Sequence, residues 1–196
     1  MPRFSEEEKS LIREDLLAKG EQLFVQHGLK KVTVDDLTKA AAIAKGSFYA
    51  FFENKEHLYV EILFRIQNKV LADTEVFLQE NSSLPPKELV RELIVWSFDG
   101  MEKYPMLAQQ DLLELRTHLT RKLPKEILGR YPDLDMEGAK LLVQHGIKFK
   151  YETEIVGNAF QALSLAFDGM HGYEPEKKEA VVDILINGIV NEIVEE

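Results

Sequence analysis

The spacing of apolar residues constrains the fold class of this chain more than any other feature. These residues recur every three or four positions along almost its whole length, as in Ile12, Leu16, Leu17, Leu23 and Phe24, which is the stripe of an amphipathic helix. No segment alternates apolar and polar residues for long enough to require a β-strand. The pattern therefore predicts an all-α fold with about nine or ten helices.

Capping residues divide this pattern into elements. Gly28 is a natural stop for the first helix. Thr33 and Asp36 have the spacing of a capping box, so we expect them to open a short second helix. Asn54 can cap a long helix that continues to about Asn81, where the clearest break in the chain begins.

Two short helices are predicted between the first helix and the long one that begins near Asn54. The second of them runs from Lys45 to about Phe52, and three or four small residues separate the pair. This is the outline of a helix-turn-helix, in which the second short helix enters the major groove of DNA. Phe48 and Phe52 are expected to pack inward. The residues expected to face outward are Lys45, Gly46, Ser47 and Ala50.

Charge is distributed unevenly along the chain. The 196 residues carry a net charge of −10, which taken alone argues against nucleic-acid binding. However, residues 1–60 hold 9 basic and 10 acidic side chains, so nearly all the excess negative charge lies beyond them. Lys30, Lys31, Lys39 and Lys55 surround the short-helix pair, as a phosphate-binding surface requires. The near-neutral segment is therefore the part that can approach a polyanion.

The residues from Thr33 to Leu58 form a more specific pattern. In chain order they include Thr33, Leu37, Ala41-Ala-Ile-Ala44, Lys45-Gly-Ser-Phe-Tyr-Ala-Phe-Phe52 and Asn54-Lys-Glu-His-Leu58. In these residues the sequence resembles the TetR family of bacterial transcriptional repressors. The resemblance implies a homodimer in which residues 1–54 form a three-helix DNA-binding domain for a palindromic operator. It also implies that residues 55–196 form a helical effector-binding and dimerisation domain.

The resemblance assigns DNA-binding roles to seven residues. Thr33 and Lys55 correspond to phosphate contacts at the openings of the second and fourth helices, and Tyr49 to a tyrosine whose hydroxyl meets the DNA backbone. The positions that face the groove are those of Lys45, Gly46, Ser47 and Ala50.

Three residues depart from the family's pattern. Ala42 stands where a glycine often takes a positive φ, so its Cβ adds a steric cost. Ala44 replaces a serine that often caps the recognition helix, at a cost of about 1 kcal/mol of helix stability. Phe51 replaces a tyrosine or histidine and removes a hydrogen bond to DNA. Base-specific readout is therefore expected to be leaner than is usual for the family.

The last helix, from about Ala180 to Val194, is apolar on more than one face. A helix of this kind must be covered on most sides. A partner subunit is the economical explanation, and two-fold symmetry is the commonest arrangement. The interface candidates are Ile155, Ala159, Leu163, Val182, Ile186, Ile189 and Ile193.

Large apolar side chains supply the candidates for an effector pocket, because pockets are mostly apolar with a few polar anchors. These candidates are Trp96, Met101, Tyr104, Phe160 and Phe167. Aromatic residues at helical spacing are also typical of an ordinary core, so the chemistry of the effector is not readable from them.

No residue pattern indicates catalysis, a bound metal or a cofactor. The chain has no cysteine, its five histidines lack metal-ligand spacing, and it has no glycine motif for nucleotides. We therefore predict a non-enzymatic, cytoplasmic regulator, a repressor released from its operator by a small molecule. The alternatives are an activator or a helical small-molecule-binding protein that keeps the helix-turn-helix scaffold without repressing.

Overall fold

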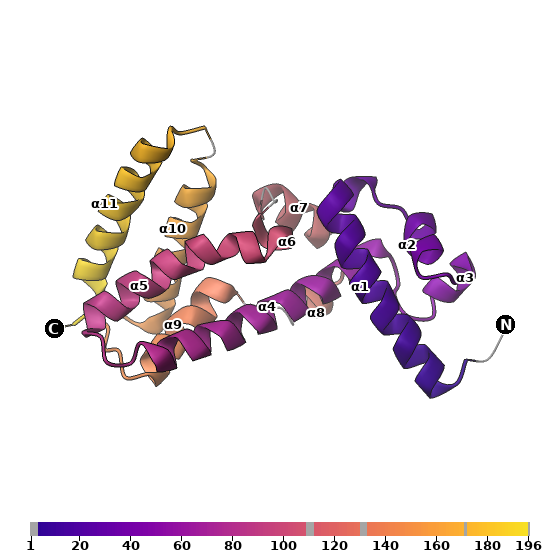
Figure 1. Ribbon diagram of the computed structural model, residues 1–196, viewed down its shortest axis with the longest axis horizontal. Helices are drawn as coiled ribbons and strands as arrows, with labels where there is room; N and C mark the ends of the chain where they lie inside the picture. Colours follow the sequence, from indigo (N-terminus) through magenta and orange to yellow (C-terminus); the bar gives the residue numbers. More distant parts are fainter. Residues whose placement is uncertain (1–3, 109–111, 130–132, 171, 196) are drawn as a thin grey trace. The chain divides into compact units, whose positions relative to one another are not determined.

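The computed structural model describes residues 4–108, 112–129, 133–170 and 172–195. Over these residues the fold is all-α, as predicted (Figure 1). The long helices are α1 (Glu6–Lys31), α4 (Lys55–Glu80), α5 (Pro86–Asp99), α10 (Thr153–Asp168) and α11 (Pro175–Ile193). The shorter ones are α2 (Val34–Ala40), α3 (Lys45–Phe48), α6 (Pro105–Ala108), α7 (Leu112–Lys122), α8 (Lys125–Leu128) and α9 (Leu134–Gln144), with a 3₁₀ segment at Gly100–Lys103. The count exceeds nine or ten because α6 and α8, with four residues each, are too short to show a period.

The contacts of the chain divide it into two compact units. The first unit comprises Met1–Ile66 and Lys103–Tyr131, and the second comprises Gln67–Glu102 and Pro132–Glu196. Helix α4 therefore supplies residues to both units. The functional domains expected from the resemblance, residues 1–54 and 55–196, are a different division and stay a prediction.

Local sequence signals decide where the first helices begin and end. Gly28 has a φ of 74° and leaves helical geometry, which ends the regular part of α1 as predicted. The capping box of Thr33 and Asp36 is also confirmed, since each side chain accepts the amide hydrogen of the other residue. Helix α3 ends at Phe48 rather than Phe52, and residues 49–51 continue as turns.

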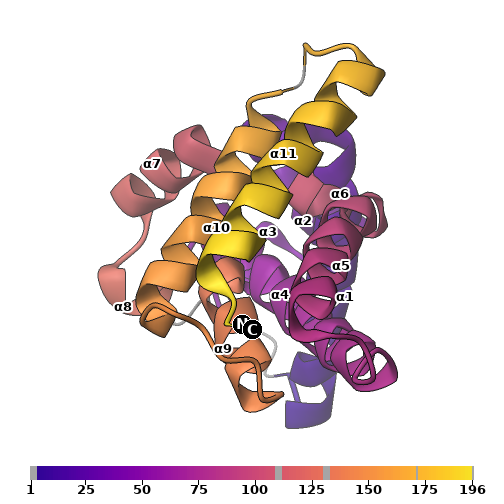
Figure 2. The ribbon, with the colours of Figure 1, turned by 90° about the vertical axis from the view of Figure 1, so that its left-hand side faces the viewer.

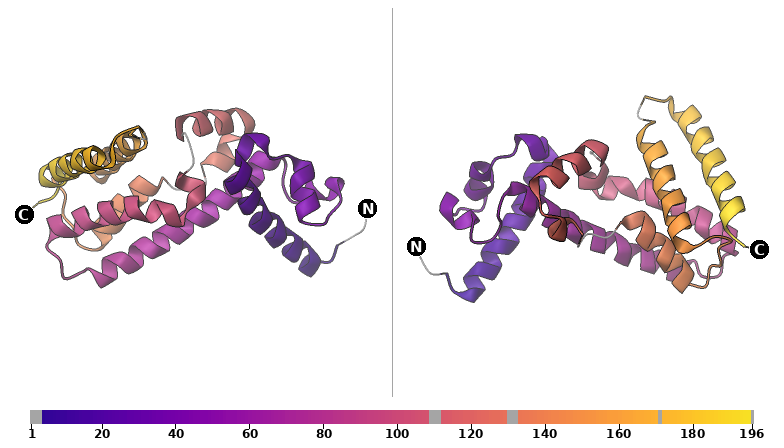
Figure 3. Two further views of the ribbon diagram at one scale, coloured as in Figure 1. Left: turned by 45° about the horizontal axis from the view of Figure 1, so that its top comes forward. Right: turned by 180° about the vertical axis from the view of Figure 1, so that it is seen from behind.

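The core of the first unit is aromatic and aliphatic. Phe48 and Phe52 are completely or almost completely buried, as predicted, at 0% and 1% exposure. Phe24 of α1 packs edge-on against Tyr59 of α4, with ring centroids 5.0 Å apart. Figure 3 shows from two further sides that α2 and α3 lie next to each other within this unit. The burial of both phenylalanines fixes which face of α3 is exposed.

The second unit is built from the distal half of α4 with α5, α9, α10 and α11. Its core is aliphatic and includes Leu78, Val90, Leu142, Val156 and Ile186, all fully buried. Helices α10 and α11 run side by side (Figure 2). Helices α9 and α10 pack so closely that a Cβ built on Gly157 would lie 2.6 Å from the Met136 side chain. A larger residue at this crossing would therefore have to displace the Met136 side chain.

Candidate nucleic-acid interface

Helices α2 and α3 are joined by a tight turn of small residues. Ala42 has a φ of 53°, the left-handed region in which the sequence predicted a steric cost for its Cβ. The amides of Ala42 and Ile43 donate to the carbonyls of Lys39 and Thr38 and so close the turn. Ala44 then stands at the N-cap of α3 without a side-chain hydrogen bond, also as predicted. The pair is a helix-turn-helix.

The exposed face of α3 carries the groove-facing residues predicted from the sequence. Lys45, Gly46 and Ala50 are exposed, and Ser47 is half-buried. The space around Gly46 is open, since a Cβ built there would meet no atom within 4 Å. Tyr49 is 56% exposed, so its hydroxyl is not committed to the core. A surface this small in side-chain volume lets DNA come close to the helix backbone.

A carboxylate accompanies the lysine at the start of α3. Lys45 Nζ lies 2.9 Å from Asp35 Oδ2 of α2, and both side chains are more than half exposed. This hydrogen bond raises the pKa of Lys45 above its ordinary value, so the side chain stays cationic. Exposed ion pairs contribute little to stability, so a phosphate can compete for the ammonium group. Sequence reasoning missed Asp35, because its partner is ten residues away.

Thr33 and Lys55 lie at the positions expected for phosphate contacts, but their polar atoms already have partners. The hydroxyl of Thr33 donates to Asp36 Oδ2 at 2.6 Å. Lys55 Nζ donates to the carbonyl oxygens of Leu29, Lys30 and Val32, at 2.7, 3.2 and 2.7 Å. The ammonium group of Lys55 is therefore turned toward its own unit.

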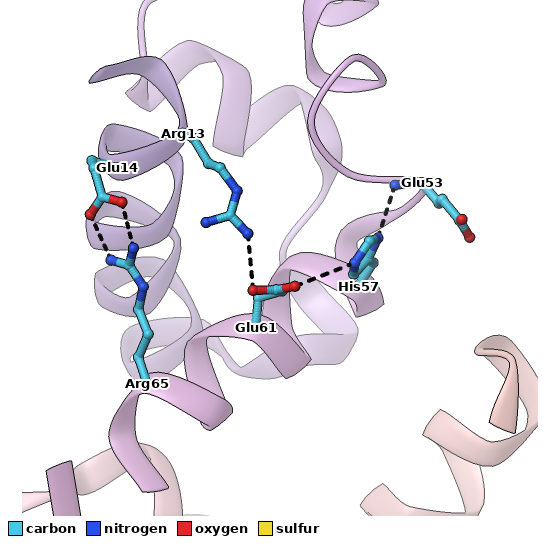
Figure 4. A network of polar contacts seen from close by, with 6 residues as sticks. All are labelled: Arg13, Glu14, Glu53, His57, Glu61 and Arg65. Atoms are coloured by element: carbon cyan, nitrogen blue, oxygen red, sulfur yellow. Dashed lines mark hydrogen bonds and ion pairs between the residues drawn. The ribbon is translucent and has the colours of Figure 1, made fainter. Parts of the chain in front are cut away.

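Two ion-pair systems hold α1 against the proximal half of α4 within the first unit (Figure 4). Arg65 makes a two-pronged contact with Glu14, which lowers the pKa of the Glu14 carboxyl. Arg13 donates to Glu61 at 3.0 Å, and Glu61 also lies 3.7 Å from His57. Paired charges therefore hold together the two long helices of the unit that contains the candidate interface. Finding them from sequence would require the mutual register of two helices about fifty residues apart.

The effector-pocket candidates are distributed over both units. Trp96 packs on Phe77 and Phe160 is buried in the core of the second unit, while Tyr104 is buried in the first. Phe167 stacks on Phe98 with centroids 4.2 Å apart, and Lys178 Nζ lies 3.8 Å from the Phe167 ring centre. The side chain of Met101 lies outside the described part of the chain.

The interface candidates fall into two groups. Leu163, Ile186 and Ile193 are buried in the core of their own unit, whereas Ile155 is 50% exposed. Ala159, Val182 and Ile189 are half-buried. Two further apolar side chains, Leu165 at 50% and Ile184 at 71%, are exposed on α10 and α11. Helical periodicity marks them as apolar positions, but only the packing distinguishes the covered from the uncovered ones.

The described residues contain neither a membrane-spanning helix nor a metal-binding cluster. None of the helices there combines the length and apolar character that a bilayer crossing demands. In the same stretches, no three His, Cys, Asp or Glu side chains lie together in an arrangement suited to a metal ion.

The helix-turn-helix with its exposed α3 face defines a DNA-binding protein. Residues 16–62 match the TetR family of bacterial regulatory proteins. This segment of the chain is therefore the DNA-binding domain of the TetR family, and that family comprises transcriptional regulators and not enzymes.

Individual relatives agree with this family. The transcriptional repressor DhaR of Mycobacterium sp. is 36% identical over 95 residues, 45% of this chain and 46% of that protein. The repressor KstR2 of Mycolicibacterium smegmatis is 29% identical over 146 residues, covering 64% and 70%. The match therefore spans less than half the length of DhaR. SmeT, the repressor of the Stenotrophomonas maltophilia multidrug efflux pump SmeDEF, shares the fold, with a TM-score of 0.60 over 94% of this chain and 91% of SmeT at 16% identity.

Proposed function

We propose that this protein is a cytoplasmic transcriptional repressor that binds a palindromic operator as a homodimer and leaves it when a small-molecule effector binds. The exposed face of α3 is the observation that carries the proposal. Small residues there allow close approach to base edges, while Lys45 and Ser47 supply hydrogen-bond donors. Tyr49 flanks this face with an exposed hydroxyl group suited to a phosphate oxygen, whereas the Thr33 hydroxyl would have to exchange its hydrogen bond to Asp36 for one to a phosphate.

Exposed apolar side chains on α10 and α11 support the homodimer. Ile155, Leu165 and Ile184 each leave half or more of their surface uncovered in the single chain. Burying such residues against a second copy removes apolar area from water, at about 25 cal/mol per Å². A two-fold axis would present two α3 helices to half-sites about 34–36 Å apart, or multiples of that distance.

Release by an effector follows from differential binding. A ligand that prefers a conformation unable to span two half-sites shifts the population away from DNA, by no more than its difference in affinity for the two states. The aromatic candidates in the second unit, Trp96, Phe160 and Phe167, are the residues we assign to the effector. The effector's chemical class stays open.

Selection from a random library of duplexes tests the proposed function. Purified protein should enrich a palindrome, and its affinity for that duplex should fall steeply with salt because phosphate contacts release counterions. Failure to enrich any duplex, or enrichment of a site without two-fold symmetry, would contradict the proposal. Sedimentation of the free protein at micromolar concentration should give a dimer.

Lys45→Ala links this binding to α3. The variant should bind the selected duplex several-fold more weakly and should tolerate more base changes at one position of each half-site. Lys148→Ala, an exposed lysine of the second unit, is the matched control and should bind like the unaltered protein. If the two variants bound the duplex with equal affinity, Lys45 and the α3 face that carries it would not contribute to DNA binding.

A further inference from the structure

The ammonium group of Lys55 points toward the backbone of its own unit. Lys55 is the first residue of α4, and its Nζ reaches back across 23 to 26 positions of sequence to three backbone carbonyls. We propose that Lys55 is a positioning residue for DNA binding: it fixes the segment between α1 and α2, and thereby the amino end of α2, without contacting a phosphate. This inference rests on the proposed function.

The segment that Lys55 holds lacks a regular helical ending. Gly28, with its φ of 74°, interrupts α1, so Leu29 and the residues after it are not part of an unbroken helix. The last carbonyls of a helix have no partner within it, and a lysine can donate to them. Leu29 and Val32 are buried residues, at 8% and 2% exposure, and the hydrogen bonds from Lys55 to their carbonyls are part-buried, so water replaces this donor less readily than on an open surface.

The same segment leads directly into α2. Val32 precedes Thr33, whose capping box with Asp36 starts the helix. Helix α2 has only seven residues, packs on α1 through the buried Leu37 and is joined to α3 by the turn at Ala42, so its position depends on the contacts at its two ends and on this one face. A shift of Val32 would therefore move the amino end of α2, and with it the hydroxyl of Thr33.

The hydrogen bonds of Lys55 also explain why it is unsuited to a phosphate contact. An ammonium group has three N–H donors, and three carbonyl oxygens lie within reach of this one. The bond to Lys30 is exposed, so water can replace it, but a contact that also drew the ammonium group away from Leu29 or Val32 would leave a part-buried carbonyl without its donor. Lys39 on α2, by contrast, is exposed and can contact DNA without that loss.

A charge-conserving substitution separates the two roles. Arginine contacts phosphates at least as well as lysine, but its planar fork cannot converge on three oxygens around one nitrogen. We therefore expect Lys55→Arg to bind the duplex selected by the unaltered protein at least five-fold more weakly. Lys39→Arg is the matched control and should bind within two-fold of the unaltered protein. Full affinity of Lys55→Arg would overturn the inference.

Two uncharged variants extend the test. Lys55→Gln keeps two N–H donors, so the inference expects it to retain more affinity than Lys55→Met. A phosphate contact requires the charge, so it would predict equal losses for both variants, with the slope of log affinity against log salt falling by about 0.9. A slope that stays the same in Lys55→Gln supports positioning, and a slope that falls by that amount overturns it.

Hydrogen exchange in the DNA-free protein gives a measurement that does not depend on operator binding. In Lys55→Met, the amides of Val32, Asp36 and Leu37, which report the turn and the start of α2, should exchange faster, while those of α10 stay unchanged. Unaltered exchange at these three amides would overturn the inference. Failure of the unaltered protein to select any duplex would instead contradict the proposed function.

Discussion

Two pairs of packed helices, α1 with α4 in the first unit and α9 with α10 in the second, differ in the partners that their acidic side chains find across the contact. Each pair meets at a glycine, Gly20 or Gly157. Along α1 and α4, acidic side chains face arginines, as in Glu14 with Arg65. Along α9 and α10, an acidic side chain faces only a neutral donor.

That neutral contact lies at the amino end of α9. Asp135 Oδ1 accepts a hydrogen bond of 2.9 Å from the Ser164 hydroxyl. Burial raises the pKa of Asp135 to about 6, the Ser164 hydrogen bond works against this, and nearby Asp133 adds to it. In the first unit, Arg65 lowers the pKa of Glu14. Ionisation is thus favoured at one contact and penalised at the other, so the stability that each contact contributes should respond to pH in opposite directions.

Asp135→Asn should give the largest effect. The folded protein holds the Asp135 proton up to pH about 6, whereas the unfolded chain releases it near pH 3.8. The stability from this group is therefore complete below pH 3.8 and is lost as the pH rises through 6. At about 1.4 kcal/mol per unit, asparagine should raise the free energy of unfolding by up to about 3 kcal/mol at pH 8.

Denaturant unfolding from pH 4 to pH 8 measures this difference at each pH. The variant and the unaltered protein should have equal stability near pH 4, and the gap should open between pH 4 and pH 6. Glu137→Gln on the same helix, where Lys140 pairs with the carboxylate, is the control and should show no gain at pH 8. A constant gap at every pH would mean that Asp135 is not the cause.

Gly157→Ala tests the packing half of the comparison. Its Cβ would lie 2.6 and 2.9 Å from Cε and Sδ of Met136 and 3.1 Å from its Cα, so the Met136 side chain must change its conformation and its backbone must give by a few tenths of an ångström. A Cβ on Gly20 would meet the side-chain ends of Ile62 and Leu58 at 3.1 Å, which can shift, and that of Leu37 at 3.5 Å, an ordinary contact. We expect Gly157→Ala to lower the free energy of unfolding by about 1–3 kcal/mol, and Gly20→Ala by less. The reverse order would show that α1 and α4 are the tighter pair.

Glu14→Gln should have a small effect with the pH dependence opposite to that of Asp135. Because Arg65 lowers the pKa of Glu14, its stabilisation is present above pH 4.5, the ordinary value, and is lost as the pH falls below it. Both side chains are about half exposed, so the loss at pH 7 should stay under about 1 kcal/mol. If Glu14→Gln were more stable than the unaltered protein at pH 7, the ion pair with Arg65 would not stabilise the contact between α1 and α4.

The features that could be predicted from sequence are those decided by neighbours in the chain. Gly28, the capping box at Thr33 and the inward face of Phe48 each follow from residues within four positions. The orientation of Lys55 and the burial of Asp135 depend on partners more than twenty positions away, so no local pattern reveals them. Apolar periodicity likewise predicts that a face is covered, but not whether its own chain or another covers it.

Ala42→Gly should give the smallest effect, and it sharpens the comparison by testing strain in the turn of the first unit. An L-residue in left-handed geometry costs roughly 1–2 kcal/mol, and glycine avoids this. Glycine also loses more backbone entropy on folding, by roughly 0.5–1 kcal/mol relative to alanine, so the two terms nearly cancel. We expect a net gain of about 0.5 kcal/mol in the free energy of unfolding, measured by denaturant titration.

Ala50→Gly, at an exposed position without positive φ, is the matched control and should lose stability, because only the entropy term acts there. Equal losses at both positions would show that the left-handed geometry of Ala42 carries no strain.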